Sequence, residues 1–280
     1  MTKKDIIDPN TGDHIDEYLS PSRVNSFIEC PGEWALRYLY KMDSPPATDK
    51  MIRGSKIEDY LNHNLDRSLL INPYYENDLD EDSQKIADKL LKKLDILFDK
   101  FEGKMEMQKQ LTNFKFPIPM AGFKDYEIGD VLFELKTTTR KPTRPLDNHI
   151  RQVMIYKGWH PGDEDFKLEK TCIIYGIIKK IPEVHFWISE DLREYFDFGE
   201  YSLISPGQVE ANHVSMRVSI PSMYHHIRHY QNTGYSLVSL NFAHYRMRGY
   251  NPRECIDHME YKFRLFKDLE EEVQHESSTS

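Results

Sequence analysis

The spacing of apolar side chains changes along the chain. Between residues 83 and 101 it predicts an amphipathic helix, because apolar residues recur every three or four positions. These residues are Ile86, Leu90, Leu94, Leu97 and Phe101. From residue 114 onward the pattern changes to short alternating or apolar runs, which are typical of strands. The strand-like runs cover residues 114–118, 122–128, 131–138, 170–180 and 183–189, and one helical segment, residues 146–158, interrupts them.

The central segment therefore consists of three strands, a helix and two further strands. Helical patterns flank it on both sides: Ser20 is a candidate N-cap with Pro21 at the first helical position, and Pro252 begins a final helix. This order predicts an α/β fold with a mixed central sheet, flanking helices and a C-terminal helical extension. Pro117 and Pro119 place the first strand at an edge of the sheet, since proline has no N–H to donate.

The same pattern suggests a division of the chain. We expect a flexible N-terminus over residues 1–18 and a core over residues 19–190, with a helical insertion around residues 60–105. Residues 191–275 are expected to form a mainly helical extension that packs on this core.

Composition limits the classes of protein that remain. With 280 residues, of which 39% are hydrophobic, the chain is long enough for a sizeable core and is not expected to be disordered. The polar N-terminus predicts no secretory signal, and no apolar run approaches the length of a membrane span. Three dispersed cysteines give no disulfide framework. We therefore expect a cytoplasmic protein, in a bacterium or a phage-infected host cell, with no membrane partner.

Two carboxylates and a lysine stand out in the central strands. Glu134 and Lys136 are two residues apart, so their side chains project from the same face of one strand. A turn over residues 128–130 would bring Asp125, on the preceding strand, beside Glu134. Paired carboxylates suit a hard divalent cation, to which the Leu135 backbone carbonyl could be a further ligand. On this pattern alone, a surface salt bridge remains an alternative, because acidic residues and lysines are common.

Four segments, in order, resemble the RecB-like branch of the PD-(D/E)XK nucleases, of the stand-alone phage or bacterial type. The segment GFKDYEIGDVLFELKTT, residues 122–138, is similar to the two strands that carry the family's metal-binding carboxylates and lysine. LSPSRVNSFIECP, residues 19–31, resembles the family's opening helix, and RGSKIEDYL, residues 53–61, resembles its first motif. Gln152 and Tyr156 fit the motif Q-x-x-x-Y. The four segments lie within residues 19–156.

The resemblance implies a restriction-endonuclease-like fold and a role for each matching residue. Asp125 and Glu134 would bind Mg²⁺ or Mn²⁺, and Lys136 would orient the attacking water or a phosphoryl oxygen. At the position where the family usually has histidine, this chain has Glu58, which would make a third carboxylate ligand. Gln152 would hydrogen-bond near the metal-bound water or the substrate.

Further polar residues are candidate contacts for DNA. By the resemblance, Tyr156 would contact the DNA backbone. A basic loop directly after Lys136 and the start of the opening helix would contact phosphates, although a solvated surface role remains an alternative. The residues concerned are Arg140, Lys141 and Arg144 in the loop, and Ser22 and Arg23 in the helix. The formal net charge of −9 requires that any DNA-binding face be local.

Some relatives hold an iron–sulfur cluster on four cysteines, but this chain has only Cys30, Cys172 and Cys255. We therefore expect no iron–sulfur cluster, and we expect Cys30 to serve in packing. His225 and His229 have the spacing of metal ligands but no evident third ligand, so we do not expect zinc there. The segment YRMRGY, residues 245–250, interleaves aromatic and basic residues, which would suit single strands or an ordinary surface.

The resulting hypothesis is a metal-dependent deoxyribonuclease. The resemblance favours an exonuclease that processes duplex ends or single strands over an endonuclease. Three alternatives remain: a catalytically silent DNA-binding or assembly module with the nuclease fold, a nuclease directed at RNA, and an unrelated enzyme in which the four motifs are coincidental. A recombination or replication protein is a candidate partner, and the oligomeric state is left open.

Overall fold

A computed structural model of the chain describes residues 6–8, 11, 15, 18–43, 46–65, 77–197, 199–237 and 252–278, with the side chains of the last helix described for residues 253–267. The chain divides into two compact units. The first unit consists of Met1–Tyr18 and Ala47–His213, and the second of Leu19–Pro46 and Val214–Ser280. Each unit is described separately.

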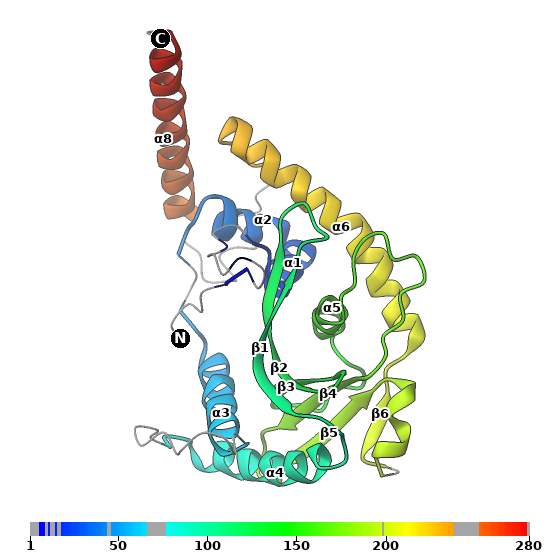
Figure 1. The fold of residues 1–280 in the computed structure, drawn as a ribbon. Helices are drawn as coiled ribbons and strands as arrows, with labels where there is room; N and C mark the ends of the chain where they lie inside the picture. Colours follow the sequence, from blue (N-terminus) through cyan, green and yellow to red (C-terminus); the bar gives the residue numbers. More distant parts are fainter. Residues whose placement is uncertain are drawn as a thin grey trace. The chain divides into compact units, whose positions relative to one another are not determined.

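A six-stranded mixed sheet forms the centre of the first unit, with its strands in the order β1-β2-β3-β4-β5-β6 (Figure 1). The strands are β1 (Met105–Asn113), β2 (Met120–Ile128), β3 (Val131–Thr138), β4 (Thr171–Ile177), β5 (Glu183–Ile188) and β6 (Tyr201–Leu203). Strands β1, β2 and β3 form an antiparallel meander. Strand β4 is parallel to β3 and antiparallel to β5, and β6 is parallel to β5.

Helices cover both faces of this sheet. Helix α4 (Glu81–Phe98) lies along one face and α5 (Asp147–Tyr156) along the other (Figure 1). Because β3 and β4 are parallel, the chain must cross over between them, and α5 provides that crossover. Helix α3 (Asp49–Leu65) packs against α4 and against β3. A short 3₁₀ helix, η2 (Glu190–Tyr195), follows β5.

The main core lies between the sheet and helices α3 and α4. Alternate residues of the strands point to this side, as the pleat requires. Helix α4 presents its predicted apolar stripe to them, and Gly176 on β4 lies directly under the Leu90 side chain. The fully buried members of this core include Ile57, Leu61, Ile86, Leu90, Leu94, Phe133, Cys172 and Ile174.

The predicted α/β class, the mixed sheet, the flanking helices and the C-terminal helix are confirmed. The predicted strand over residues 114–118 is wrong: the edge strand is β1, and residues 114–119 form the turn between β1 and β2. The two prolines explain this, because proline lacks the N–H that a strand ladder needs. Strand β6 was not predicted.

The second unit is mainly helical. It contains α1 (Pro21–Glu29), α2 (Pro31–Trp34), the π-helix η1 (Ala35–Leu39), most of α6 (Pro206–Thr233) and α8 (Pro252–Ser278). The predicted N-cap is confirmed, since the Ser20 side chain accepts a hydrogen bond from Arg23 N. Cys30 is buried in an apolar cluster with Leu36, Tyr40 and Cys255, so it serves in packing as predicted.

The boundaries between the two units lie at residues 18–19, 46–47 and 213–214. Residues 19–46 group with the C-terminal helices, and residues 191–213 group with the sheet, to which β6 adds a strand. In the N-terminal segment, Ile6 is buried and Ile7 N donates a hydrogen bond to Gln110 Oε1 on β1. These residues pack on the first unit rather than extending freely.

Candidate active site

Asp125 and Glu134 meet where two strands separate. The β2–β3 ladder pairs Ile128 with Val131 at the turn and ends at the pair Tyr126 and Phe133. One further step in this register places Asp125 opposite Glu134, as the sequence predicts. At this point the backbone N–H of Leu135 donates a hydrogen bond of 2.8 Å to Asp125 Oδ2 instead of to a β2 carbonyl. An aspartate side chain has therefore replaced a strand partner.

The hydrogen bond from Leu135 N–H to Asp125 also indicates where the Leu135 carbonyl points. In an extended strand, the N–H and C=O of one residue point to the same neighbour. Since the Leu135 N–H points to Asp125, the carbonyl oxygen points toward the same edge of β3. The backbone oxygen that the sequence suggested as a ligand thus lies on the side of the aspartate.

Glu134 and Lys136 project together from β3, on the face covered by α5. The Glu134 side chain has no exposed surface, and its Oε1 accepts a hydrogen bond of 2.6 Å from Lys136 Nζ. The same oxygen accepts a second bond of 2.6 Å from Gln152 Nε2 on α5. Among the described residues, Glu134 Oε2 has no donor although it is buried. A buried carboxylate oxygen without a partner costs free energy unless something else binds it.

Glu58 reaches this group of residues from α3. Gly54, four residues earlier on the same helical face, lets the helix approach β3 closely. A Cβ atom at Gly54 would lie only 2.9 Å from Thr137 Oγ1, so any larger residue would force the helix or the threonine to move. The glycine in the first motif therefore has a physical role, which is to bring Glu58 toward the strand that carries Glu134.

The three carboxylates influence each other electrostatically. Burial, and then the charge of Asp125, raise the pKa of Glu58 to about 7 and that of Glu134 to about 8. Burial also raises the pKa of Asp125, against the opposing effects of Lys136 and the Leu135 N–H. Three acidic groups this close together bind protons more tightly than usual. A metal cation could replace those protons and would be attracted for the same reason.

Lys136 is the positive charge within the group. Burial alone would lower the pKa of its ammonium group, but the nearby carboxylates outweigh this effect and raise it above the ordinary value. The carboxylates responsible are Glu134, Asp125 and Glu58. Lys136 therefore stays charged at neutral pH, and it can donate hydrogen bonds but cannot serve as a base.

The donor set fits a hard divalent cation. Carboxylate and carbonyl oxygens are the ligands that Mg²⁺ and Mn²⁺ prefer, and Glu134 Oε2 is a buried oxygen in need of a partner. Within the described part of the chain, however, no three His, Cys, Asp or Glu side chains are arranged as a ready-made metal site. The carboxylates can raise each other's pKa without being close enough to share a metal ion, because electrostatic interaction acts over longer distances than ligation does. The three carboxylates share one neighbourhood, although they are not arranged as a complete three-ligand site.

Helix α5 supplies the other predicted site residues. Gln152 Nε2 lies 3.3 Å from the Tyr156 hydroxyl, so the amide is held between Tyr156 and Glu134. Tyr156 itself is buried, and the burial raises the pKa of its hydroxyl above the ordinary value. Buried bonds fix α5 in place: Arg151 donates to Asn212 Oδ1, and Gln208 and Asn212 both donate to Asp147.

Three residues near the site were not predicted. Tyr175 is the residue of β4 paired with Lys136, and its hydroxyl lies 2.6 Å from His149 Nδ1. Burial, and then the charges of Lys136 and Arg151, lower the pKa of His149 to about 3, so the imidazole is neutral. The signal for His149 was its position one turn before Gln152 on the same face of α5. The third residue, Gln108, gave no sequence signal.

The predicted DNA-contacting residues fall in different places. Arg140, Lys141 and Arg144 are exposed in the loop between β3 and α5, and Arg144 forms a 3.3 Å ion pair with Asp147. The loop therefore begins at the end of the strand that carries Lys136. Ser22 and Arg23 belong to the second unit. There the Ser22 and Ser20 hydroxyls lie 2.8 Å apart, and the Arg23 guanidinium lies over the Tyr38 ring.

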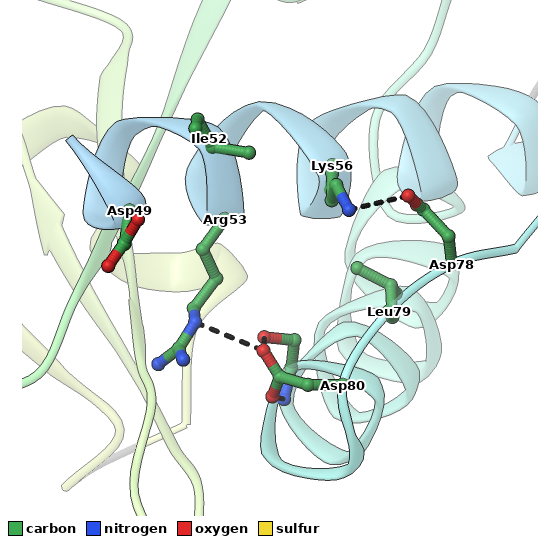
Figure 2. A pocket seen from close by; sticks show the side chains of 8 residues that line it. Asp49, Ile52, Arg53, Lys56, Asp78, Leu79 and Asp80 are labelled. Atoms are coloured by element: carbon green, nitrogen blue, oxygen red, sulfur yellow. Dashed lines mark hydrogen bonds and ion pairs between the residues drawn. The ribbon is translucent and has the colours of Figure 1, made fainter. Parts of the chain in front are cut away.

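Figure 2 shows a separate pocket of about 220 Å³, between α3 and the start of α4. Arg53 pairs with Asp80, and Lys56 with Asp78, across it (Figure 2). The cationic residues lie on a different face of α3 from Gly54 and Glu58. Asp49 also lines the pocket, so its three acids outnumber its two cations and it has no excess positive charge with which to attract a nucleic acid.

Two other sequence features are a pair of histidines and an aromatic–basic segment. His225 and His229 lie in α6, where the described residues include no third metal ligand beside them. The segment 245–250 lies outside the described residues. None of the helices that the structure describes is both long and apolar enough to cross a membrane.

Comparisons with known proteins find similarity among solved structures alone. No family model matches the chain, and no curated protein matches it. Among solved structures, a protein from Eubacterium rectale, whose crystal structure is named "Putative exonuclease", is similar with a TM-score of 0.48 and 14% sequence identity. The likeness covers 74% of this chain and 80% of that chain. At this distance, a functional conclusion must come from the site itself.

Proposed function

We propose that this protein is a metal-dependent nuclease that hydrolyses phosphodiester bonds of DNA. The observation that carries the proposal is the meeting of Asp125, Glu134 and Lys136 where β2 and β3 separate, with Glu58 brought toward them by α3. Carboxylates grouped beside a charged lysine are the side chains that metal-dependent phosphodiester hydrolysis requires.

Glu58, Asp125, Glu134 and the Leu135 carbonyl would hold Mg²⁺ or Mn²⁺. When bound, the cation would lower the pKa of a water molecule and offset the charge that grows on the phosphate. Gln152 keeps the Glu134 carboxylate in one orientation through its bond to Oε1. Glu134 Oε2, which has no hydrogen-bond partner among the described residues, would be the oxygen available to the cation.

Lys136 would act as an electrostatic donor. Its raised pKa keeps it protonated, so it would stabilise a phosphoryl oxygen or orient the attacking water rather than remove a proton. Lys136 Nζ, which donates to Glu134 Oε1, would be the group of this side chain that contacts the substrate or the water. The basic loop of Arg140, Lys141 and Arg144 would hold the flanking phosphates.

We further propose that the enzyme digests DNA from ends. The test is to incubate the protein with end-labelled linear duplex DNA, circular single-stranded DNA and RNA, in Mg²⁺, Mn²⁺ or EDTA. The expected result is metal-dependent release of nucleotides from linear DNA and sparing of the circle. Cutting of the circle would indicate an endonuclease, and cutting of RNA alone would indicate an RNA-directed enzyme.

A Lys136→Ala protein serves as the control for contaminating nucleases. Equal cutting by wild type and Lys136→Ala would remove the catalytic assignment. If neither protein cuts but both bind DNA, a non-catalytic DNA-binding module would be the better description.

A further inference from the structure

Gln108 interrupts the regular geometry of β1. Its backbone φ is +50°, in the left-handed region that non-glycine residues rarely adopt. Met107 pairs with Tyr126 and Lys109 pairs with Lys124, so Gln108 falls opposite Asp125. Within Met105–Asn113, this is the one position whose partner is missing from the β1–β2 ladder.

The interruption is not an inserted residue. The register is the same on both sides of Gln108, whereas a β-bulge would shift it by one. The strand therefore adopts an unfavourable conformation at a single residue and then resumes. A conformation of this kind persists only where surrounding contacts hold it, and such residues gather at functional sites.

The contacts of the Gln108 side chain supply a reason. Its Nε2 donates a hydrogen bond of 2.8 Å to Glu58 Oε1, and its side chain also hydrogen-bonds to Asp125. A glutamine amide carries two N–H groups, so one neutral side chain can serve two carboxylates. Here the two carboxylates come from different elements, α3 and β2.

Glu58 and Asp125 repel each other, since each lies within the electrostatic reach of the other. A positive residue between them would neutralise both and compete with a cation for the same oxygens. A neutral amide donor instead fixes the two side chains and leaves their negative charge available to a cation.

We propose that Gln108 is a positioning residue, which holds Glu58 and Asp125 at the spacing at which both can bind one divalent cation. This inference rests on the proposed function, since it assumes that the carboxylates are metal ligands. It also explains why β1, which contributes no ligand of its own, departs from regular strand geometry opposite Asp125.

The test is a Gln108→Gly substitution. Glycine adopts a φ of about +50° without steric cost, so the variant loses the amide while the strand keeps its path. Its Tm should equal or exceed that of the wild type. Mn²⁺ affinity, measured by titration calorimetry or electron paramagnetic resonance, should fall by roughly 10–100-fold, as for other residues that orient metal ligands.

Gln110→Gly is the matched control. Gln110 is on the same strand, but its amide donates to the Ile7 carbonyl and to Thr112 rather than to a carboxylate. This variant should bind Mn²⁺ as the wild type does, even if its Tm falls. If the wild type cuts DNA, Gln108→Gly should regain most of the rate at high Mn²⁺ with an unchanged KM for DNA.

The outcomes separate the two claims. Wild-type Mn²⁺ affinity in Gln108→Gly would overturn the positioning role, whether or not the protein cuts DNA. Weaker Mn²⁺ binding in Gln108→Gly, in a protein that cuts no nucleic acid, would support the positioning role and contradict the proposed function. If Glu134→Ala leaves Mn²⁺ binding unchanged, the cation is held elsewhere and both claims fail.

Discussion

At the scale of single residues, the candidate site is a group of acids held close together at an energetic cost. Glu58, Asp125 and Glu134 all have raised pKa values, because burial penalises the ionised form of each, and the charge of Asp125 adds repulsion at Glu58 and Glu134. Lys136 offsets part of this penalty but does not remove it. A fold that keeps such an arrangement gives up stability for function, as active sites commonly do.

Glu58→Gln should therefore stabilise the protein in a pH-dependent way. The pKa of Glu58 is about 7 in the fold against an ordinary value of 4.5, so the folded state favours the protonated form. Its contribution to stability is present below pH 4.5 and is lost as pH rises through 7. The variant, which cannot ionise, should gain on the order of 1–3 kcal/mol over wild type above pH 7 and little at low pH.

Denaturant unfolding without divalent cations, at about pH 5 and about pH 8, measures this difference. Addition of Mg²⁺ should shrink it at the higher pH by stabilising the wild type. If the stability difference between Glu58→Gln and wild type is the same at both pH values, the pKa of Glu58 is not raised in the folded protein.

The residues of the site divide into those that sequence can predict and those that it cannot. Asp125, Glu134 and Lys136 follow from strand alternation and a short turn, which are local rules. Gln108 and Tyr175 enter the site through strand pairing across the sheet, at positions opposite Asp125 and Lys136. No local pattern encodes which residue of one strand will pair with which residue of another.

At the scale of elements, the local pattern predicted the strands that are most buried. Strand β4 is a mostly apolar run and β3 opens with one, and β3 begins and ends where the sequence predicts. Strand β1 was missed because its sequence, MEMQKQLTN, is mostly polar and its position in the sheet depends on pairing with β2. The three residues of β6 are too few to show any period.

The approach of α3 to β3 gives a prediction at this scale. Gly54→Ala places a methyl group 2.9 Å from Thr137 Oγ1, which should displace α3 and with it Glu58. Small displacements of catalytic groups are costly, so DNA cleavage should fall roughly 10–100-fold. Thr137→Ala removes the opposing hydroxyl, so the double variant should recover much of the lost rate.

The DNA-cleavage rates of the wild type, the two single variants and the double variant form a double-mutant cycle. Gly207→Ala is the control, because an added Cβ there would meet nothing closer than 3.7 Å. Additive effects of Gly54→Ala and Thr137→Ala would contradict the proposed packing contact.

At the scale of the whole molecule, charge is the main question. The net charge of −9 opposes binding to nucleic acid, so any attraction must be local. The loop after β3 could provide this local attraction, because Arg140, Lys141 and Arg144 are all exposed there. Several acids, by contrast, are engaged with lysines, as in the pairs Lys109–Glu127 and Lys93–Glu200.

Neutralising the three loop cations should change the salt dependence of DNA binding. Each phosphate contact contributes about 0.9 to the slope of log affinity against log salt, so an Arg140→Gln, Lys141→Gln, Arg144→Gln protein should lose about 2–3 units of slope. Fluorescence anisotropy with a labelled duplex, in Ca²⁺ rather than Mg²⁺ to limit cleavage, measures the slope. An unchanged slope would place the phosphate contacts elsewhere on the molecule.

The central claim is that Lys136 and its carboxylate neighbours catalyse phosphodiester hydrolysis. The most direct measurement is the single-turnover rate of DNA cleavage by wild type, Lys136→Met and Lys170→Met, with Mg²⁺ and with EDTA. Lys170 is a matched lysine, exposed and paired with Asp130. The account predicts metal-dependent cleavage that falls by roughly 100–1,000-fold in Lys136→Met and stays at the wild-type rate in Lys170→Met. Cleavage in EDTA, or an undiminished rate in Lys136→Met, would contradict it.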